Sequence, residues 1–523
     1  MRNIHRLAVA ALLAAPAVAV APGSPLASAE APVSCATRVN NTIAKLLECV
    51  ELEGAREHQA ALQAIADANG DTRVSGSPGF DLSKDYAVGV LEAAGFDVTV
   101  QPFQFQTFIT LTPPVLEQVS PPPAGPVVNN IFSYSGSGDV TAAVTALPAP
   151  PADATPGCEA ADFAGLPAGN IALISRGACT FAIKATNAYH ADASGVVIYN
   201  NTAGGINGTL GNGFTLDIGV TSVTQAVGQQ LAATPGLVMR LKTDTFRGVA
   251  TTYNVLAESK TGNPNNVVMA GAHLDSVNAG PGINDNGSGT AAILELAENL
   301  RTTPVKNKVR LALWGAEESG LVGSTYYVAN LPAEELAKIA LYLNFDMIGS
   351  PNHVFFIYDG DDSDGVGAGA GPAGSAQIEK TFERYFTQRG IPFKGTDFSG
   401  RSDYQAFINN GIPAGGLFTG AEGIKTAQEA AIWGGTAGIA YDPCYHQACD
   451  TYANNNDEAL GVNIDAVAFA TLTYALNTTD INDAKARAVP GSTTPSAQMA
   501  GVSMTSAGSQ GGLHDHDPEL DES

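Results

Sequence analysis

The sequence predicts an α/β fold with a central, mostly parallel sheet, and two observations support this prediction. Short apolar runs alternate with stretches of helical periodicity over the second half of the chain. The first such pair is residues 267–270 and residues 289–300, and the loop between them carries His273 and Asp285. Ligands of open parallel sheets bind beyond the carboxyl ends of the strands. We therefore expect the functional site in this loop.

Composition limits the classes of function. A chain of 523 residues is long enough for two domains. Its 51 acidic and 26 basic residues give a net charge of −25, which argues against nucleic acid as a partner because phosphate binding needs a basic surface. The charge fits a soluble, secreted protein. A preference for neutral or cationic substrates is also compatible, although solubility is the simpler explanation.

Residues 1–29 have the pattern of a secretory signal peptide. A basic start precedes the apolar, Ala-rich residues 7–20, and Ala27, Ser28 and Ala29 form a small-residue cleavage site. A membrane anchor is the alternative, but the apolar run is short and Pro16 interrupts it. We therefore expect an extracellular protein that acts as a monomer and has no membrane contact after the signal is removed.

Export permits disulfide bonds. The six cysteines allow fifteen pairings, but they fall into local pairs along the chain. We predict the disulfides Cys35–Cys49, Cys158–Cys179 and Cys444–Cys449. A cysteine–zinc site is the weaker alternative, because no Cys-x-x-Cys pair occurs in the sequence.

The first part of the chain reads as two helices followed by a strand. Residues 55–68 and 82–94 have helical spacing, residues 70–79 form a Gly/Ser loop between them, and residues 97–105 alternate like a strand.

The sequence pattern changes over residues 109–248, where prolines separate short β-rich runs. Residues 169–175 and 195–199 read as strands, and residues 181–193 between them read as a helix. The histidine of this region, His190, has no acid or histidine at ligand spacing, so we interpret it as a structural or surface residue.

The α/β alternation starts near residue 253. The predicted strands are residues 267–270, 309–314, 340–345 and 354–358, and the predicted helices are residues 289–300, 321–330, 378–389 and 464–475. The tail from about residue 479 to residue 523 loses its apolar pattern and becomes Ser/Thr/Gly-rich and then acidic. We interpret it as disordered or removable.

Three carboxylates and two imidazoles recur at strand ends or in tight loops. Any one of them has an ordinary explanation, because an Asp can cap a helix and a His can be a hydrogen-bonded core residue. Together they could hold two zinc ions, each with an open position for water or substrate. Asp285 is the natural bridge, with metals roughly 3.5–4 Å apart. The predicted ligands are His273, Asp285, Glu318, Asp346 and His446.

Glu317 and Glu318 follow the predicted strand at residues 309–314. In extended backbone, neighbouring side chains point in opposite directions. One carboxylate could therefore bind metal while Glu317 faces the substrate as a general base. Asp275, placed two residues after His273 on the same strand face, could orient that imidazole.

Tyr445 and His446 lie inside the predicted Cys444–Cys449 loop, which would hold them rigidly. A phenol at this position could stabilise an oxyanion.

Five segments, in this order, resemble the secreted di-zinc leucyl aminopeptidase family. They are GAHLDSVNAGPGINDNGSGTAA, LWGAEESGLVGSTYYV, LNFDMIGSPN, SGRSDYQAF and CYHQACD. The resemblance covers about residues 50–108 and 252–478. It implies the zinc exopeptidase fold, in which helices flank a mixed, mostly parallel sheet.

The resemblance also implies roles for individual residues. The positions matching His273 and Asp346 bind one zinc ion, those matching Glu318 and His446 bind the other, and Asp285 bridges them. Glu317 matches the general base, and Tyr445 matches the residue that stabilises the tetrahedral intermediate. The peptide bond after Asp285 is expected to be cis. Residues near the substrate would be Gly400, Arg401, Met347 and Phe418, the last two in an apolar side-chain pocket.

A weaker resemblance, carried by GNIALISRGACTF and GVVIYNN, is to the protease-associated domain inserted in many such peptidases. It implies a lid or substrate-access role. The predicted domains are residues 30–108 with 251–478 for the catalytic part and residues 109–250 for the insert. Some relatives carry calcium near the termini of the catalytic domain. Here Asp465 is kept but Gly461 stands where an acid is expected, so we do not expect calcium.

We therefore expect a zinc aminopeptidase that removes large apolar residues such as leucine from peptides with a free N-terminus. The alternatives are a carboxypeptidase or a glutaminyl cyclase on the same fold, or a receptor-like binding protein that has lost its zinc. Completeness of the ligand set argues against the binding protein. A carboxypeptidase would need several bases for a terminal carboxylate, whereas Arg401 is the one base that stands out near the site.

Overall fold

The structure is a computed structural model of the whole chain, and it describes residues 35, 37–202, 204–206, 208–301 and 303–487. The predicted signal at residues 1–29 and the tail after residue 487 lie outside the described residues.

Four parallel strands form the centre of the sheet. The order is β14 (Ala414–Phe418), β11 (Ile339–Phe345), β9 (Asn263–His273) and β10 (Asn307–Trp314). Neighbours in this series pair in parallel. Their carboxyl ends therefore meet at one edge of the sheet, where the loops that follow them are brought together.

Antiparallel pairing appears at both flanks of this centre. On one side β12 (Phe356–Tyr358) pairs antiparallel with β14 and parallel with β13 (Lys394–Thr396). On the other side β8 (Val238–Glu258) pairs antiparallel with both β10 and β1 (Asp97–Ser120). The predicted mixed, mostly parallel sheet is confirmed.

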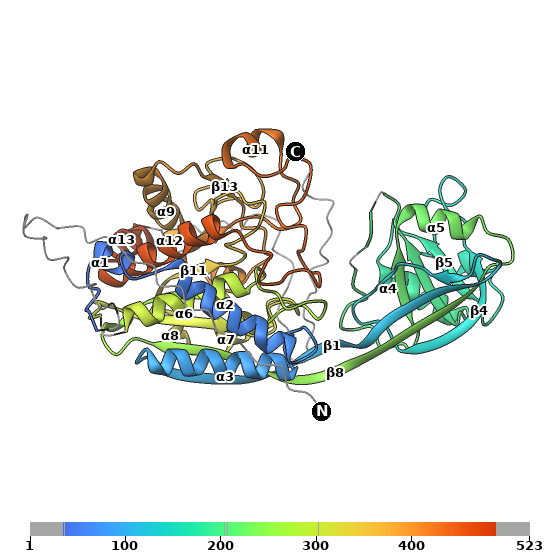
Figure 1. Cartoon of the computed structure of the whole chain (residues 1–523), viewed down its shortest axis with the longest axis horizontal. Coiled ribbons are helices and arrows are strands. Elements are labelled where there is room, and N and C mark those ends of the chain that lie inside the picture. The colour runs from blue at the N-terminus through green and yellow to red at the C-terminus, as the bar shows by residue number, and fades with distance from the viewer. Residues whose placement is uncertain (1–34, 36, 203, 207, 302, 488–523) are drawn as a thin grey trace, which may run out of the picture. The chain divides into compact units, whose positions relative to one another are not determined.

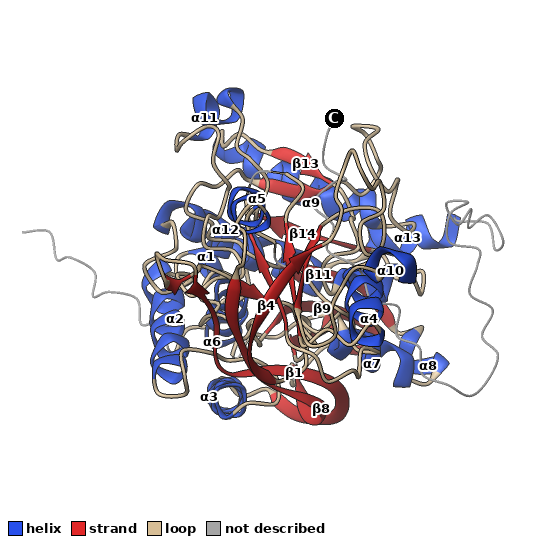
Figure 2. Ribbon diagram, turned by 90° about the vertical axis from the view of Figure 1, so that its right-hand side faces the viewer, coloured by secondary structure: helices blue, strands red, loops and turns tan. Residues whose placement is uncertain are grey.

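Both faces of the central strands are buried, which explains why they read as continuous apolar runs. Along β9, Val268 and Ala270 join one core while Val267 and Met269 join the other. The first core is closed by α1 (Ile43–Leu47), α2 (Leu52–Asp67), α3 (Pro78–Ala93), α6 (Gly287–Leu300), α9 (Ser375–Arg389) and α12 (Asp457–Leu476). The second is closed by α7 (Val322–Asn330) and α10 (Tyr404–Ile408). Figure 2 shows α2 and α6 on one side of β9 and β11, and α7 and α10 on the other.

Helix α12 is long and apolar enough to cross a membrane by length and composition. In the structure, 72% of its apolar window is buried inside the protein. Its residues pack against α6, α9 and the sheet in the first core. Helix α12 is therefore a core helix.

The strands of the insert continue the sheet beyond β8, and the insert has two cores of its own. Strands β4 (Gly138–Ala146), β5 (Ile171–Ser175), β6 (Gly195–Tyr199) and β7 (Val220–Val223) pair in parallel. The short strands β2 (Gly125–Pro126) and β3 (Asn130–Ile131) pair with β1 and β7. Helices α4 (Phe181–His190) and α5 (Gln225–Ala232) and the 3₁₀ turn Ala160–Phe163 complete it. The predicted strands and helix of this region are all present.

The insert is connected to the catalytic part by a two-stranded ribbon. Strands β1 and β8 run side by side and pair from Asp97 opposite Glu258 to Ser120 opposite Val238 (Figure 1). The chain therefore enters and leaves the insert through paired residues, as expected for an insertion. β1 is longer than the predicted strand at residues 97–105, and the register shifts near Pro113 and Pro114, which lack the N–H that a ladder needs.

Several elements were not predicted. Strand β14, helices α8 (Ala333–Leu336), α10 and α11 (Ala427–Trp433), and helix α13 (Thr479–Arg487) are too short to show a clear period. α13 corrects the predicted end of the fold at residue 478. Ile481 is fully buried in the first core, and Lys485 donates a hydrogen bond to the Ile339 carbonyl oxygen. One large apolar residue in a polar helix gives almost no pattern, so its burial was not visible in the sequence.

The ribbon predicts that the catalytic part folds without the insert. Replacing residues 107–248 with Asn-Gly would join Gln106 to Val249, which lie opposite each other, through a favoured hairpin turn. None of the residues in the two catalytic cores comes from the deleted segment. We expect a soluble protein with helical circular dichroism and one cooperative thermal transition. An aggregated product without such a transition would show that the insert is needed for folding.

Candidate metal centre and active site

The predicted ligands meet at the carboxyl edge of the central strands. His273 is the last residue of β9, Asp346 follows β11 directly, and Glu318 lies in the turn after β10. Asp285 ends the loop before α6, whose first turn is capped by the Asn286 side chain accepting from the Gly289 N–H. The expected cis peptide bond between Asp285 and Asn286 is present.

Three ligand atoms surround a first position. The His273 Nε2 atom lies 3.2 Å from Asp285 Oδ1 and 3.3 Å from Asp346 Oδ1. All three side chains are buried, and one ligand atom from each lies within 4.8 Å of the others. This arrangement could hold one metal ion.

A second position lies beside the first. The His446 Nε2 atom lies 3.2 Å from Asp285 Oδ2 and 3.0 Å from Glu318 Oε2. The two oxygens of Asp285 therefore face different imidazoles, which is the geometry expected of a carboxylate that bridges two ions.

The chemistry of the site fits bound cations. Asp346 Oδ1 and Glu318 Oε1 are buried and have no hydrogen-bond partner in the structure. Burying carboxylates without compensation is costly. Burial opposes ionisation of Asp285, but hydrogen bonds from His273 and His446 hold its pKa below its usual range. Divalent ions would supply the positive charge that this group of carboxylates needs.

Glu317 has the position expected of a base, although the predicted backbone is wrong. Glu317 and Glu318 lie in a tight turn, not in extended backbone, and the preceding Ala316 has φ of +55°. The turn still separates the carboxylates: Glu317 Oε2 lies 4.0 Å from His273 Nε2, whereas Glu318 faces His446. Burial, supported by the nearby carboxylates of Asp403 and Glu318, raises the pKa of Glu317 well above its usual value.

Asp275 contacts His273 differently from the prediction. Strand β9 ends at His273, so Asp275 lies in the following loop. Its backbone oxygen is 3.1 Å from His273 Nδ1, closer than its carboxylate Oδ1 at 3.7 Å. The carboxylate also accepts the Glu317 N–H at 3.2 Å. Asp275 thus links the imidazole to the turn that carries both glutamates.

A chain of hydrogen bonds that the sequence did not reveal supports Asp346. The Trp314 indole donates to the Tyr342 hydroxyl at 2.8 Å, and Tyr342 donates to Asn344 Oδ1 at 3.1 Å. The Asn344 amide donates to Ser402 Oγ at 2.8 Å, and Ser402 donates to Asp346 Oδ2 at 2.6 Å. Each residue in this chain donates to the next, and the last bond ends on Asp346 Oδ2. Asp346 Oδ1 is therefore left facing the first metal position.

Asp285, the predicted bridge, is held by two further residues outside the predicted set. The Asp450 carboxylate accepts the N–H groups of Asn284 at 2.8 Å and Asp285 at 2.9 Å. The buried Arg73 guanidinium donates to the carbonyl oxygens of Leu274, Pro281 and Gly282. The loop between His273 and Asp285 is therefore fixed at both ends.

Tyr445 lies against the second position. Its ring stacks on His446 with centroids 3.8 Å apart, and its hydroxyl accepts from Arg401 Nη2 at 3.2 Å. Burial raises the pKa of Tyr445 well above its usual value, so the phenol keeps its proton. Arg401 also pairs with Glu422, with 2.7 Å between Nη1 and Oε1.

The other predicted substrate residues lie near this group. The Gly400 N–H donates to the Tyr404 hydroxyl at 2.9 Å, and its φ of +83° favours glycine. Met347 follows the predicted ligand Asp346 and is buried, and its carbonyl oxygen accepts the Thr419 N–H at 2.9 Å. That bond places Phe418, at the end of β14, beside Met347.

The disulfides follow the predicted pattern where both partners are described. Cys444 is bonded to Cys449 around Tyr445 and His446, and Cys158 is bonded to Cys179 in the insert. Cys35 and Cys49 are each disulfide-bonded as well.

Asp403, which the sequence did not single out, lies within the quoted segment SGRSDYQAF. It is almost fully buried, and burial raises its pKa to about 7. Its position after Ser402 was visible in the sequence, but its proximity to Glu317 depends on the folding of the loop before α10.

Comparisons with known proteins agree with this geometry. The model of peptidase family M28 matches residues 254–471, and the PA domain model matches residues 140–231. An aminopeptidase of Pseudomonas aeruginosa is 48% identical over 471 residues, covering 87% of this chain and 86% of that protein. The probable lipoprotein aminopeptidase LpqL of Mycobacterium tuberculosis is 44% identical over 82% of this chain and 85% of its own length. The probable leucine aminopeptidase 2 of Aspergillus fumigatus is 52% identical over 61% of this chain and 64% of its own length.

Solved structures show the same fold. The aminopeptidase from Aneurinibacillus sp. strain AM-1 has a TM-score of 0.61 at 27% identity, covering 82% of this chain and 95% of that one. A zinc aminopeptidase from Bacillus subtilis has a TM-score of 0.60 at 25% identity, covering 81% and 95%. The predicted resemblance is confirmed: the chain belongs to peptidase family M28 and is a metallo-aminopeptidase with an inserted PA domain.

Proposed function

We propose that this protein is an exported aminopeptidase with two zinc ions, which removes large apolar residues such as leucine from the N-termini of peptides. The observation that carries this proposal is the placement of Asp285, whose two oxygens face His273 and His446. His273 also lies beside Asp346, and His446 also lies beside Glu318. Glu317 lies beside His273 at the first position but is not one of the predicted ligands.

The donor set favours zinc. Each position offers one imidazole nitrogen and two carboxylate oxygens, which leaves room for water or substrate in a catalytic zinc site. The solved relative from Bacillus subtilis is described as a zinc aminopeptidase. When bound, such ions polarise a carbonyl group and lower the pKa of a bound water to about 7.

The chain's own residues would handle protons and charge. Glu317, whose carboxylate is more basic than usual because burial raises its pKa, would take the proton from the attacking water and pass it to the leaving amine. The protonated Tyr445 hydroxyl would donate a hydrogen bond to the oxyanion.

Charge around the site favours a substrate with a free amine over one with a free carboxylate. The carboxylates at the metal positions and the buried Asp403 surround the bond to be cleaved with acidic groups. Arg401 is already paired with Glu422 at 2.7 Å, so it is not an open site for a terminal carboxylate. Phe418 is partly buried and supplies apolar surface, whereas Met347 is 3% exposed. Five fungal relatives are named leucine aminopeptidase 2 or probable leucine aminopeptidase 2.

Export is supported by the predicted signal and by the disulfides, which persist in oxidising compartments outside the cytosol.

We further propose that the PA insert controls access of longer peptides to the site.

The proposed function predicts a strict need for a free amine. Leucine p-nitroanilide should be hydrolysed, N-acetyl-leucine p-nitroanilide should not, and a chelator should abolish activity that zinc then restores. Release of p-nitroaniline by continuous absorbance measures all three. Equal rates on the free and the blocked substrate would contradict an aminopeptidase.

The two adjacent glutamates should fail in different ways. Glu317→Gln keeps the ligands, so it should retain both zinc ions while kcat falls by about 10²–10⁴-fold, which is the usual contribution of a positioned base. Glu318→Ala removes a ligand and should lose one ion and some thermal stability. Elemental analysis beside kcat separates the roles. Loss of zinc in Glu317→Gln, or near-normal turnover with both ions bound, would show that the assignment is wrong.

Ser402→Ala should weaken the first position. Ser402 orients Asp346 through a 2.6 Å hydrogen bond, and removing such a partner typically lowers metal affinity about 10–100-fold. Competition with a chromophoric chelator measures the affinity. Ser399→Ala, in the same loop but bonded toward Tyr404, is the matched control and should not change it. Equal zinc affinity in Ser402→Ala and the wild type would contradict this role.

A further inference from the structure

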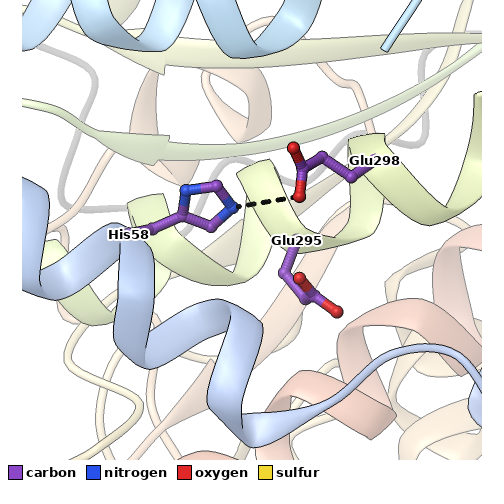
Figure 3. A group of neighbouring side chains, drawn as sticks. All are labelled: His58, Glu295 and Glu298. Carbon is purple, nitrogen blue, oxygen red and sulfur yellow. Dashed lines mark ion pairs between the residues drawn. The ribbon is translucent and has the colours of Figure 1, made fainter. Parts of the chain in front are cut away.

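A second group of metal-binding side chains lies away from the active site, between α2 and α6. It consists of His58 on α2 with Glu295 and Glu298 on α6. One ligand atom from each residue lies within 4.8 Å of the other two. Figure 3 shows His58 on one helix directed toward Glu298 on the other, while the Glu295 side chain extends from the same helix as Glu298 in a different direction.

His58 is the residue that points to a ligand. Its side chain is 6% exposed, and its Nε2 atom is buried with no hydrogen-bond partner in the structure. The nearest carboxylate oxygen, Glu298 Oε2, is 3.7 Å away, which is too far for a hydrogen bond. On the other side of the ring, Nδ1 lies 2.8 Å from the Tyr86 hydroxyl. If Nδ1 donates to that oxygen, the Nε2 lone pair faces two carboxylates.

Charge supports the same conclusion. Burial lowers the pKa of His58 to about 4, so the ring is neutral at pH 7 and brings no positive charge to the glutamates. With Glu298 Oε2 at 3.7 Å, Nε2 has no hydrogen-bond partner in either tautomer, and a cation between the two atoms would contact both. A separation of 3.7 Å is close to that between two ligand atoms of a tetrahedral zinc ion with bonds of about 2.0–2.2 Å.

The glutamates are placed for the same ion. Glu295 and Glu298 are three residues apart and so share a face of α6. Glu295 Oε1 accepts from the Glu51 N–H at 2.9 Å and the Asn299 amide at 2.8 Å. Its other oxygen lies against Gly54 of α2, where a Cβ atom would come within 2.1 Å of it. Glycine is disfavoured inside a helix, but here it gives room for the carboxylate.

We propose that His58, Glu295 and Glu298 bind a single zinc ion that is separate from the catalytic centre. One imidazole nitrogen and two carboxylate oxygens suit zinc better than calcium or magnesium, which prefer oxygen ligands. Glu298 is 41% exposed, so the ion can enter from solvent and take water as a fourth ligand. The ion would clamp α2 to α6, the helix that begins directly after the bridging Asp285.

The other acidic group outside the active site does not carry the same argument. Asp359, Asp361 and Glu379 also lie within ligand distance of one another. However, Asp361 pairs with Lys380 at 2.7 Å, and Asp359 and Glu379 accept backbone N–H groups. Unlike His58, none of these three residues has a buried side-chain atom without a hydrogen-bond partner.

The test compares the zinc content of purified full-length enzyme with that of Glu298→Gln. Both are dialysed against buffered micromolar free zinc and analysed for metal. The variant should contain one ion fewer per chain and should keep wild-type turnover of leucine p-nitroanilide. The difference between the two proteins does not depend on how many ions the active site holds, so failure of this proposal is distinguishable from failure of the proposed function. Glu53→Gln, the same change at an exposed residue of α2, is the control and should keep the wild-type content.

Tyr86→Phe provides a graded second variant. It removes the partner of His58 Nδ1 and should lower affinity for this ion about 10–100-fold, without changing kcat. Once the catalytic positions are filled, further zinc should still raise the melting temperature of the wild type. It should not raise the melting temperature of Glu298→Gln. Equal zinc content in the wild type and Glu298→Gln would overturn the proposal.

Discussion

The carboxylate of Asp285 lies between the imidazoles of His273 and His446, with one oxygen 3.2 Å from each nitrogen. A bridge of this kind tolerates little movement, because a shift of either oxygen disturbs both positions at once. The surrounding structure fixes Asp285 from several directions. Asp450 holds its N–H group, Arg73 holds the preceding loop, and the next residue, Asn286, caps α6. The precision of the site therefore depends on buried contacts that never touch a substrate.

Burial also explains why the site gathers so many acids. His273 is buried, which opposes its charged form, yet Asp346 and Glu317 raise its pKa well above the usual value. The same burial raises the pKa of Glu317. The ionisation of each group is thus adjusted by its neighbours, and bound cations would offset the charge of these buried carboxylates. This is why the orphaned oxygens of Asp346 and Glu318 support a metal centre more directly than the residue types alone.

The parts of this arrangement that follow local rules could be predicted from the sequence. His273 and Asp346 follow apolar runs, and parallel strands bring such positions together at one edge. Asp285, Glu318 and His446 were predicted as ligands from their positions in loops, and the resemblance to a known family implied the same roles. Ser402, Asp450 and Arg73 could not be found in this way, because their partners lie between 56 and 209 residues away in the chain. The turn at Glu317 was also missed, since extended backbone and a tight turn both separate two adjacent side chains.

In the fold as well, elements with a clear local sequence pattern could be predicted, whereas elements that depend on distant contacts could not. Long periodic helices such as α2 and α6 were visible, whereas α13 was not, because its burial depends on the single large apolar residue Ile481. Helix α6 shows why distant contacts matter for function. Its first turn is fixed beside Asp285, and its later turns carry Glu295, which accepts the N–H of Glu51 at the start of α2. Any contact that holds α2 against α6 therefore also restrains the helix on which the bridging carboxylate depends. Packing of α2 against α6 is therefore part of the framework that positions Asp285, although none of these residues belongs to the active site.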